Sequence, residues 1–155
     1  MVKPWPEPVE RVASALRAAA VDARLEEFPE GTPSAAAAAR AVGSTRAEIV
    51  KSLVFIAEGR PVLALVPGDK RADPGKIAAG ARVATPDEVF ASTGFEPGGV
   101  APFPAPGVSR VLMDRNLLAH ELVWIGAGSD RHMAGIAPRD LARVAKAEIV
   151  DLAEG

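Results

Sequence analysis

A lysine stands inside a run of strand-forming residues, where Lys51 interrupts the apolar stretch at residues 49–56. Because β-branched and large apolar residues dominate this stretch, it is typical of a strand with at least one buried face. Lysine is rarely buried unless it is paired, so Lys51 either follows the polar face with its ammonium in water or lines a cleft. In a cleft, the sheet would hold a cation that binds an anion such as a phosphate oxygen.

No side chain stands out as a nucleophile or general base. Ser52 lacks the G-x-S-x-G context of a nucleophile elbow, and strand alternation puts it on the face opposite Lys51, which favours a packing or hydrogen-bonding role. The sequence has no cysteine and two histidines, a set that cannot build a typical zinc site, so we expect no structural metal. Gly126 and Gly128 begin like a dinucleotide-binding fingerprint, but Arg131 stands where the third glycine is required.

Composition limits the class of protein. A chain of 155 residues is the size of one ordinary domain. The net charge of −2 excludes a globally basic protein that coats nucleic acid, so any RNA contact must be local and no DNA contact is expected. No apolar run approaches the roughly 20 residues of a membrane span, and residues 1–6 lack the apolar region of a signal peptide. We therefore expect a cytoplasmic protein without membrane contact.

Short helices and strands alternate along the chain. Strands are predicted at 25–28, 49–56, 62–66, 108–113, 121–125, 133–136 and 148–152, and helices at 8–23, 35–42, 74–80, 86–93 and 138–144. Ser34, Asp73 and Thr85 are predicted helix N-caps, and Thr45 begins a capping box that delivers one helical turn into the Lys51 strand. Because helices separate strands that partly pair as hairpins, we predict an α+β fold: a single compact domain with a mixed β-sheet flanked by short helices.

Residues 94–104 form a loop that is too long and too rich in glycine and proline for a plain turn. Long loops in compact domains are usually functional or mobile, whereas the alternative is an ordinary Gly/Pro-rich turn.

Five segments carry a family resemblance: VKSLVF at 50–55, GDKRAD at 68–73, TPDEV at 85–89, TGFEPGGVAPF at 93–103 and GAG at 126–128. In this order they resemble the YbaK/prolyl-tRNA synthetase-associated domain, the free-standing relatives of the editing domain inserted in bacterial prolyl-tRNA synthetases. The resemblance covers residues 25–152. It implies a mixed α/β fold with barrel-like curvature and hydrolysis of aminoacyl-tRNA that carries the wrong amino acid, without a metal or organic cofactor.

The resemblance also implies a catalytic site of Lys51, Gly98, Gly99 and Pro102. Lys51 is expected to anchor the phosphate of the terminal adenosine and to orient the ester. Residues 98–102 match the family's G-x-x-x-P loop, whose backbone N–H groups would bind the developing oxyanion or hold the attacking water. Attack assisted by the ribose hydroxyl or by a bound water then fits better than a catalytic triad.

The expected amino-acid pocket lies between the Lys51 strand, the Gly98 loop and the Gly128 turn. A synthetase separates amino acids that differ by one methylene by only about 1–3 kcal/mol, so such a pocket acts as a second sieve. Relatives clear alanyl, cysteinyl, seryl or threonyl esters, and we expect tRNA(Pro) or a related tRNA that carries a small wrong amino acid. The expected substrate-binding residues are Ser52, Val100, Ala101, Gly128, Ser129, Asp130 and His132.

For two of these residues, His132 and Asp130, the sequence suggests a specific role. His132 lies near the position where some family members carry a pocket histidine, whereas His120 is expected in a surface loop. Asp130 either touches the substrate's amino group or is a solvated turn aspartate.

The acceptor end of aminoacyl-tRNA is the expected partner, with an aminoacyl-tRNA synthetase as a further one. A local basic patch for the acceptor stem is predicted, with a solvated charged face as the alternative, at Lys70, Arg71, Lys76 and Arg82. Two other functions remain open: a non-catalytic module that binds tRNA or a synthetase, and a hydrolase of smaller aminoacyl esters or nucleotides.

Overall fold

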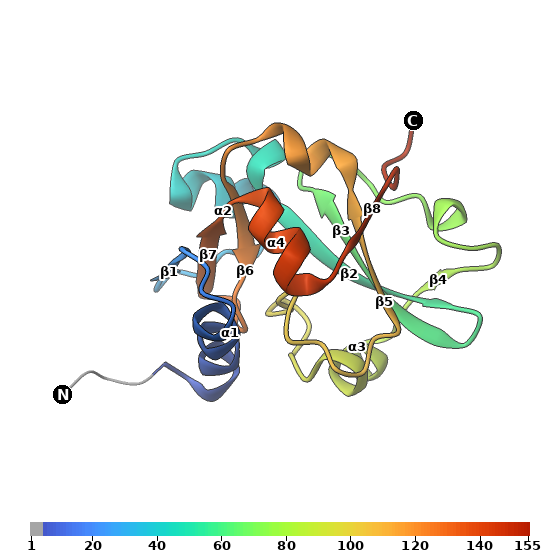
Figure 1. The fold of residues 1–155 in the computed structure, drawn as a ribbon, viewed down its shortest axis with the longest axis horizontal. Coiled ribbons are helices and arrows are strands. Elements are labelled where there is room, and N and C mark those ends of the chain that lie inside the picture. The colour runs from blue at the N-terminus through green and yellow to red at the C-terminus, as the bar shows by residue number, and fades with distance from the viewer. Residues whose placement is uncertain (1–4) are drawn as a thin grey trace.

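The computed structural model describes residues 5–155 and contains two β-sheets with short helices around them (Figure 1). One sheet has three strands in the order β1-β7-β6, and the other has five in the order β4-β2-β3-β5-β8. The predicted α+β class is confirmed. The strands divide between two sheets, neither of which closes into a barrel, and a single parallel bridge between Ile49 and Trp124 joins them.

The five-stranded sheet is mixed. β2 (Val50–Ala57) and β3 (Arg60–Pro67) form the predicted antiparallel hairpin. β3 is buried over most of its length because β5 (Arg110–Asp114) covers its second edge in parallel. β8 (Glu148–Val150) is the predicted closing edge strand and pairs in parallel with β5. β4 (Arg82–Val83) pairs with β2 and was not predicted, because its two residues are both exposed and show no apolar pattern.

The three-stranded sheet is antiparallel throughout. β7 (His132–Ile136) lies between β1 (Arg24–Glu27) and β6 (Val123–Gly126), and every residue of β7 is buried. Its register places Glu27 of β1 opposite His132.

Two α-helices begin directly after their predicted N-cap residues. Ser34 accepts a hydrogen bond from the N–H of Ala37 and starts α2 (Ala35–Val42), and Thr85 caps α3 (Pro86–Thr93) in the same way. Both helices end at a glycine in the left-handed conformation, Gly43 for α2 and Gly94 for α3. The remaining helices are α1 (Glu7–Ala18), α4 (Pro138–Ala145) and the 3₁₀ turns η1 (Arg46–Glu48), η2 (Pro74–Lys76) and η3 (Arg115–Ala119).

Two helix ends differ from prediction. α1 stops at Ala18 rather than near residue 23, because Ala20 takes a positive φ of 54° and the chain turns towards β1. η2 ends at Lys76, four residues before Gly80. The expectation for residues 1–4 lies outside the described part of the chain.

The main core fills the space between the two sheets. Side chains of α1 and α4 pack into it, together with alternate residues of β2 such as Val50 and Val54. The other face of β2 carries Phe55, which belongs to a second core under residues 72–81 and the C-terminal Leu152. Within residues 5–155, every helix is too short or too polar to span a bilayer.

Candidate active site

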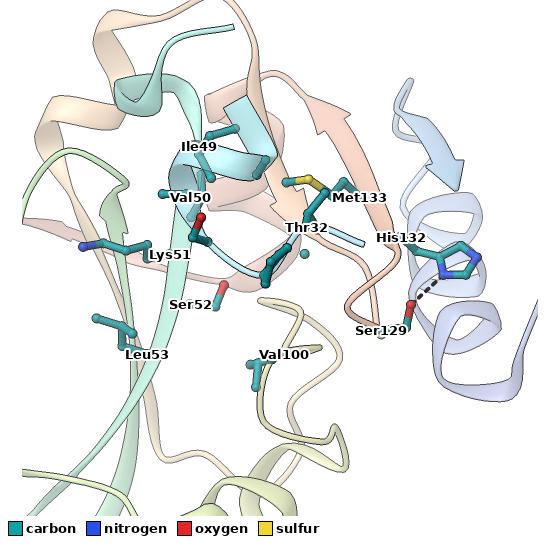
Figure 2. A pocket seen from close by; sticks show the side chains of 16 residues that line it. Thr32, Ile49, Val50, Lys51, Ser52, Leu53, Val100, Ser129, His132 and Met133 are labelled. Carbon is teal, nitrogen blue, oxygen red and sulfur yellow. Dashed lines mark hydrogen bonds between the residues drawn. The ribbon is translucent and has the colours of Figure 1, made fainter. Parts of the chain in front are cut away.

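A cavity of about 320 Å³ lies beside the first half of β2 (Figure 2). Its walls come from β2, from the loop at residues 98–100, from the turn at 126–129 with the start of β7, and from the segment 32–38. It thus lies where the three predicted segments meet. Of the predicted site residues, those that line it are Lys51, Ser52, Gly98, Val100, Ser129 and His132.

The segment 32–38 was not predicted from the sequence to line the cavity. Thr32, Ser34 and Ala38 reach the cavity because the chain passes over it on the way into α2. The backbone N–H and the hydroxyl of Thr32 both donate to the carbonyl oxygen of Asp130, at 2.8 and 3.3 Å. This contact between distant parts of the chain leaves no signal in the local sequence pattern.

Glycines allow two walls of the cavity to meet backbone to backbone. A Cβ on Gly99 would lie 2.8 Å from the Cα of Ser129, and a Cβ on Gly126 would lie 2.8 Å from the carbonyl oxygen of Val100. Both separations are too short for any side chain. Gly128 has a φ of +101° and packs against the carbonyl oxygen of Pro8. These glycines therefore fix the position of the walls, although Gly99 and Gly128 do not themselves line the cavity.

Other predicted residues lie behind the walls. Ala101 and Pro102 are buried beneath the loop. The side chain of Asp130 is exposed and stays outside the cavity, and Asp130 contributes to the site through its carbonyl oxygen. The backbone N–H of Gly99 donates to Glu96 within the loop, at 2.9 Å, so it is occupied.

Lys51 and Ser52 extend from opposite faces of β2, as alternation predicts (Figure 2). The half-buried ammonium of Lys51 donates a hydrogen bond to the carbonyl oxygen of Lys70. Burial lowers the pKa of Lys51, and the neighbouring Arg71 and Arg46 lower it further, whereas Asp69 opposes them. Lys51 therefore belongs to a local cluster of positive charge.

Arg46 is a member of this cluster that the sequence did not reveal. It lies on η1, and Gly68 packs against its backbone, with a hypothetical Cβ only 2.6 Å from the Arg46 carbonyl oxygen. The available signal was the capping box at Thr45, which predicts a turn leading into β2 but not the direction of the guanidinium.

The four basic residues predicted to contact tRNA differ in whether their charge is paired with a carboxylate. Lys70 and Arg71 are exposed beside Lys51. Lys76 forms a salt bridge with Asp151 at 3.1 Å and also donates to the carbonyl oxygen of Ala153. Arg82 pairs with both oxygens of Glu88, at 2.7 and 2.8 Å, and these bonds lower the pKa of Glu88 to about 2. The charges of Lys76 and Arg82 are therefore balanced by carboxylates.

His132 is 4% exposed, and its Nδ1 lies 2.6 Å from the hydroxyl oxygen of Ser129. Its ring meets the Trp5 ring edge-on at 5.6 Å. Burial lowers the pKa of His132, against the opposing charges of Glu27 and Asp130, so the imidazole is neutral at pH 7. Nε2 lies 3.9 Å from Glu27, beyond hydrogen-bonding distance, so no carboxylate within residues 5–155 orients the ring as in a catalytic triad.

Ser52 has an unusual environment. Its hydroxyl oxygen is buried and has no hydrogen-bond partner within residues 5–155. It also borders a second, smaller cavity of about 190 Å³, which shares Ser52, Leu53, Gly98 and Val100 with the first. In the same part of the chain, no three histidine, cysteine or acidic side chains gather closely enough to hold a metal ion.

A family match, a solved structure and a bacterial relative each cover most of the chain. The aminoacyl-tRNA editing domain matches residues 29–144. A crystal structure described as a candidate trans-editing enzyme for prolyl tRNA synthetase has a TM-score of 0.87 and 35% identity, covering 98% of this chain and 100% of that one. The uncharacterized protein YwhH of Bacillus subtilis is 32% identical over 122 residues, which are 76% of this chain and 78% of YwhH.

Larger proteins match as well. The proline–tRNA ligase of Nitratidesulfovibrio vulgaris is 36% identical over 108 residues, which are 65% of this chain and 19% of the ligase. The proline–tRNA ligase of Xanthomonas oryzae is 33% identical over 137 residues, covering 83% of this chain and 24% of the ligase. The matching region is thus a small part of each ligase.

Proposed function

The chain belongs to the aminoacyl-tRNA editing domain family, and from this premise we propose that it is a trans-editing deacylase that hydrolyses the ester of a mischarged tRNA. The likeness to a candidate trans-editing enzyme over 98% of the chain supports this proposal. The proposed substrate is tRNA(Pro), or a related tRNA, that carries a small wrong amino acid. The proposed partners are the acceptor end of that tRNA and a prolyl-tRNA synthetase.

The observation that carries the proposal is the cavity between β2, the 98–100 loop and the 126–129 turn. Its volume of about 320 Å³ accepts a small aminoacyl group together with part of the ribose. Backbone segments that meet at Gly99 and Gly126 form two walls of the cavity, so the cavity cannot become wider unless the backbone moves. A cavity of fixed width suits a sieve that admits small amino acids and excludes larger ones.

Lys51 would bind the phosphate of the terminal nucleotide at the outer side of β2. Its ammonium has three N–H donors, of which one is directed at the carbonyl oxygen of Lys70. The other two can reach a phosphate oxygen, and Arg46 and Arg71 add positive charge around it. The phosphate would then stay outside while the ester enters the cavity on the Ser52 side.

The 98–100 loop would stabilise the transition state. When water attacks the ester carbonyl, its oxygen gains negative charge, and backbone N–H groups can stabilise that charge. Because the N–H of Gly99 already donates to Glu96, the donors would come from Gly98 or Val100. The attacking water would pass a proton to the neighbouring ribose hydroxyl, which would give its own proton to the departing ester oxygen. A bond from the water oxygen to the ester carbon would form as the bond to the ribose oxygen breaks, which leaves a free amino acid and an intact ribose diol.

Hydrolysis of a panel of charged tRNAs tests the proposal. The panel contains tRNA(Pro) and other tRNAs charged with alanine, cysteine, serine, threonine and the correct amino acid. Wild type is expected to release a wrong amino acid, and Lys51→Ala is expected to lose that release. Arg60→Ala, which changes an exposed charge at the far end of the β2–β3 hairpin, serves as the control.

Two results would contradict this proposal. Undiminished hydrolysis by Lys51→Ala would remove Lys51 from the mechanism. If no ester were released while tRNA still bound, the protein would be a non-catalytic binding module.

A further inference from the structure

The unpaired hydroxyl of Ser52 points to the chemistry of the amino acid that is removed. Ser52 lies on the core side of β2, between the buried Val50 and Val54. A buried hydroxyl without a partner destabilises a folded protein, because it has lost its bonds to water. Figure 2 shows this side chain turned towards Val100 and the cavity, away from the side of Lys51.

The other hydroxyl groups that line the larger cavity have partners. The Thr32 hydroxyl donates to the carbonyl oxygen of Asp130 at 3.3 Å, and the Ser34 oxygen accepts from the N–H of Ala37 at 3.1 Å. Ser129 pairs with His132 at 2.6 Å. Among these lining hydroxyls, Ser52 alone is available for a ligand.

The surroundings of Ser52 are apolar. The smaller cavity is lined by aliphatic and aromatic side chains, proline and glycine, and Ser52 is the single polar side chain among its lining residues. Val100 lines both cavities together with Ser52, whereas the Leu53 side chain packs with Phe55 on the opposite face of β2. A ligand group that fits here has carbon atoms for Val100 and one polar atom for Ser52. With no bond to hold it, the Ser52 hydroxyl can turn about its Cα–Cβ bond to meet that atom.

We infer that Ser52 determines specificity, and that the enzyme removes hydroxyl-bearing amino acids, serine or threonine, in preference to alanine. This inference rests on the proposed deacylase function. A hydroxyl both donates and accepts, so it complements the Ser52 hydroxyl in either direction. A methyl group cannot, and a site built around a polar group rejects an analogue that leaves this group unpaired.

Pairs of substrates that differ by one hydroxyl test the inference. Seryl and alanyl esters form one pair, and threonyl and 2-aminobutyryl esters form the other, all on the same tRNA. Wild type is expected to favour the hydroxyl member in kcat/KM by about tenfold, the effect of one hydrogen bond. Ser52→Ala is expected to bring this ratio near one, and Ser52→Thr, which keeps a hydroxyl, is expected to retain it. Ser109→Ala, at an exposed position before β5, is the control.

Two results would overturn the inference. One is equal rates within each pair in wild type. The other is an equal loss for all four esters in Ser52→Ala, since Ser52 would then bind the amino group or ribose that all the esters share.

Binding separates failure of this inference from failure of the proposed function. Non-hydrolysable seryl and alanyl amides of a tRNA 3′ end report the same preference without turnover. Tighter binding of the seryl amide by wild type, lost in Ser52→Ala, would support the role of Ser52 even if no ester were hydrolysed. Equal binding of the two amides would contradict it.

Discussion

The ammonium of Lys51 bonds to the backbone carbonyl oxygen of Lys70, so the cation of β2 is held by the loop that follows β3. This loop carries the exposed Lys70 and Arg71, and it reaches back to the C-terminal residues, where the N–H of Asp73 donates to Leu152. Lys51 is therefore a half-buried, tethered cation beside two exposed ones.

Replacing Lys51 with methionine, which keeps the length of the side chain but removes the charge, is expected to lower kcat/KM for a mischarged tRNA by about 10- to 100-fold. This is the range for the loss of one charge-assisted hydrogen bond. Arg46→Ala, at an exposed position, should cost only a few-fold. For each variant, the slope of log affinity against log salt concentration should become shallower by about 0.7 for each phosphate that the protein no longer neutralises. An unchanged slope in Lys51→Met would show that this lysine does not meet a phosphate.

Gly99→Ala is expected to open the cavity and to lower both stability and activity. Its Cβ would lie 2.8 Å from the Cα of Ser129, so the 98–100 loop must move away from the turn. Overpacking of this kind costs about 1–3 kcal/mol. Gly75→Ala is the control, because its Cβ comes no closer than 3.3 Å to the Asp73 side chain. Urea unfolding and kcat/KM measure the two effects, and normal activity in Gly99→Ala would refute the role of this close approach.

Ser92, a buried residue, and Ser52, whose hydroxyl oxygen is buried, should respond differently to replacement by alanine. Ser92 donates to the carbonyl oxygen of Glu88 at 2.7 Å, so Ser92→Ala is expected to lower the free energy of unfolding by about 1 kcal/mol. Ser52→Ala removes a hydroxyl without a partner in the described chain and is expected to leave this free energy unchanged or to raise it. Chemical denaturation of both variants provides the comparison. A clear loss of stability in Ser52→Ala would reveal a partner for its hydroxyl.

Asp114 should make stability depend on pH in acid. The carboxylate is fully buried and accepts hydrogen bonds from the N–H groups of Leu152 and Ala153, at 2.8 and 3.1 Å, and from Asn116. Burial alone would raise the pKa of Asp114, but these bonds together hold it below its usual value. Since an aspartate in the unfolded chain titrates near pH 3.9, its contribution is complete above about pH 4. It is lost as the pH falls from there through the folded-state pKa.

Asp114→Asn is therefore expected to lower the free energy of unfolding by about 2–4 kcal/mol at pH 7. The difference from wild type should shrink below about pH 4. Asp151→Asn, which alters an exposed carboxylate, is the control and should cost less than about 1 kcal/mol. Thermal melts from pH 3 to 7 measure both, and a difference that stays constant across this range would show that the Asp114 charge is not the cause.

The sequence allowed the local elements to be predicted where capping residues define them. α2 and α3 were predicted from first residue to last because Ser34, Thr85 and the glycines that follow each helix act on their immediate neighbours. The division of the strands between two sheets was not predictable, because pairing such as that of β1 with β7 joins segments about a hundred residues apart.

In the site, too, local features were predictable from the sequence and contacts between distant segments were not. Strand alternation correctly placed Lys51 and Ser52 on opposite faces. The contribution of Thr32, which depends on a bond to Asp130, and the proximity of Arg46 to Lys51 depend on the tertiary fold. The roles assigned to Lys51, Gly98 and Pro102 remain predictions for the kinetic experiments.

The close approaches at Gly99 and Gly126 are made to backbone atoms, which stay the same when the side chains at the surrounding positions are exchanged. The outline of the cavity is thus insulated from changes in the residues that line it. Under the proposed role of Ser52, the residue at position 52 can be exchanged without rebuilding the site. If Ser52 sets the specificity as proposed, a single codon change there would let a duplicated copy of this protein correct a different error in translation.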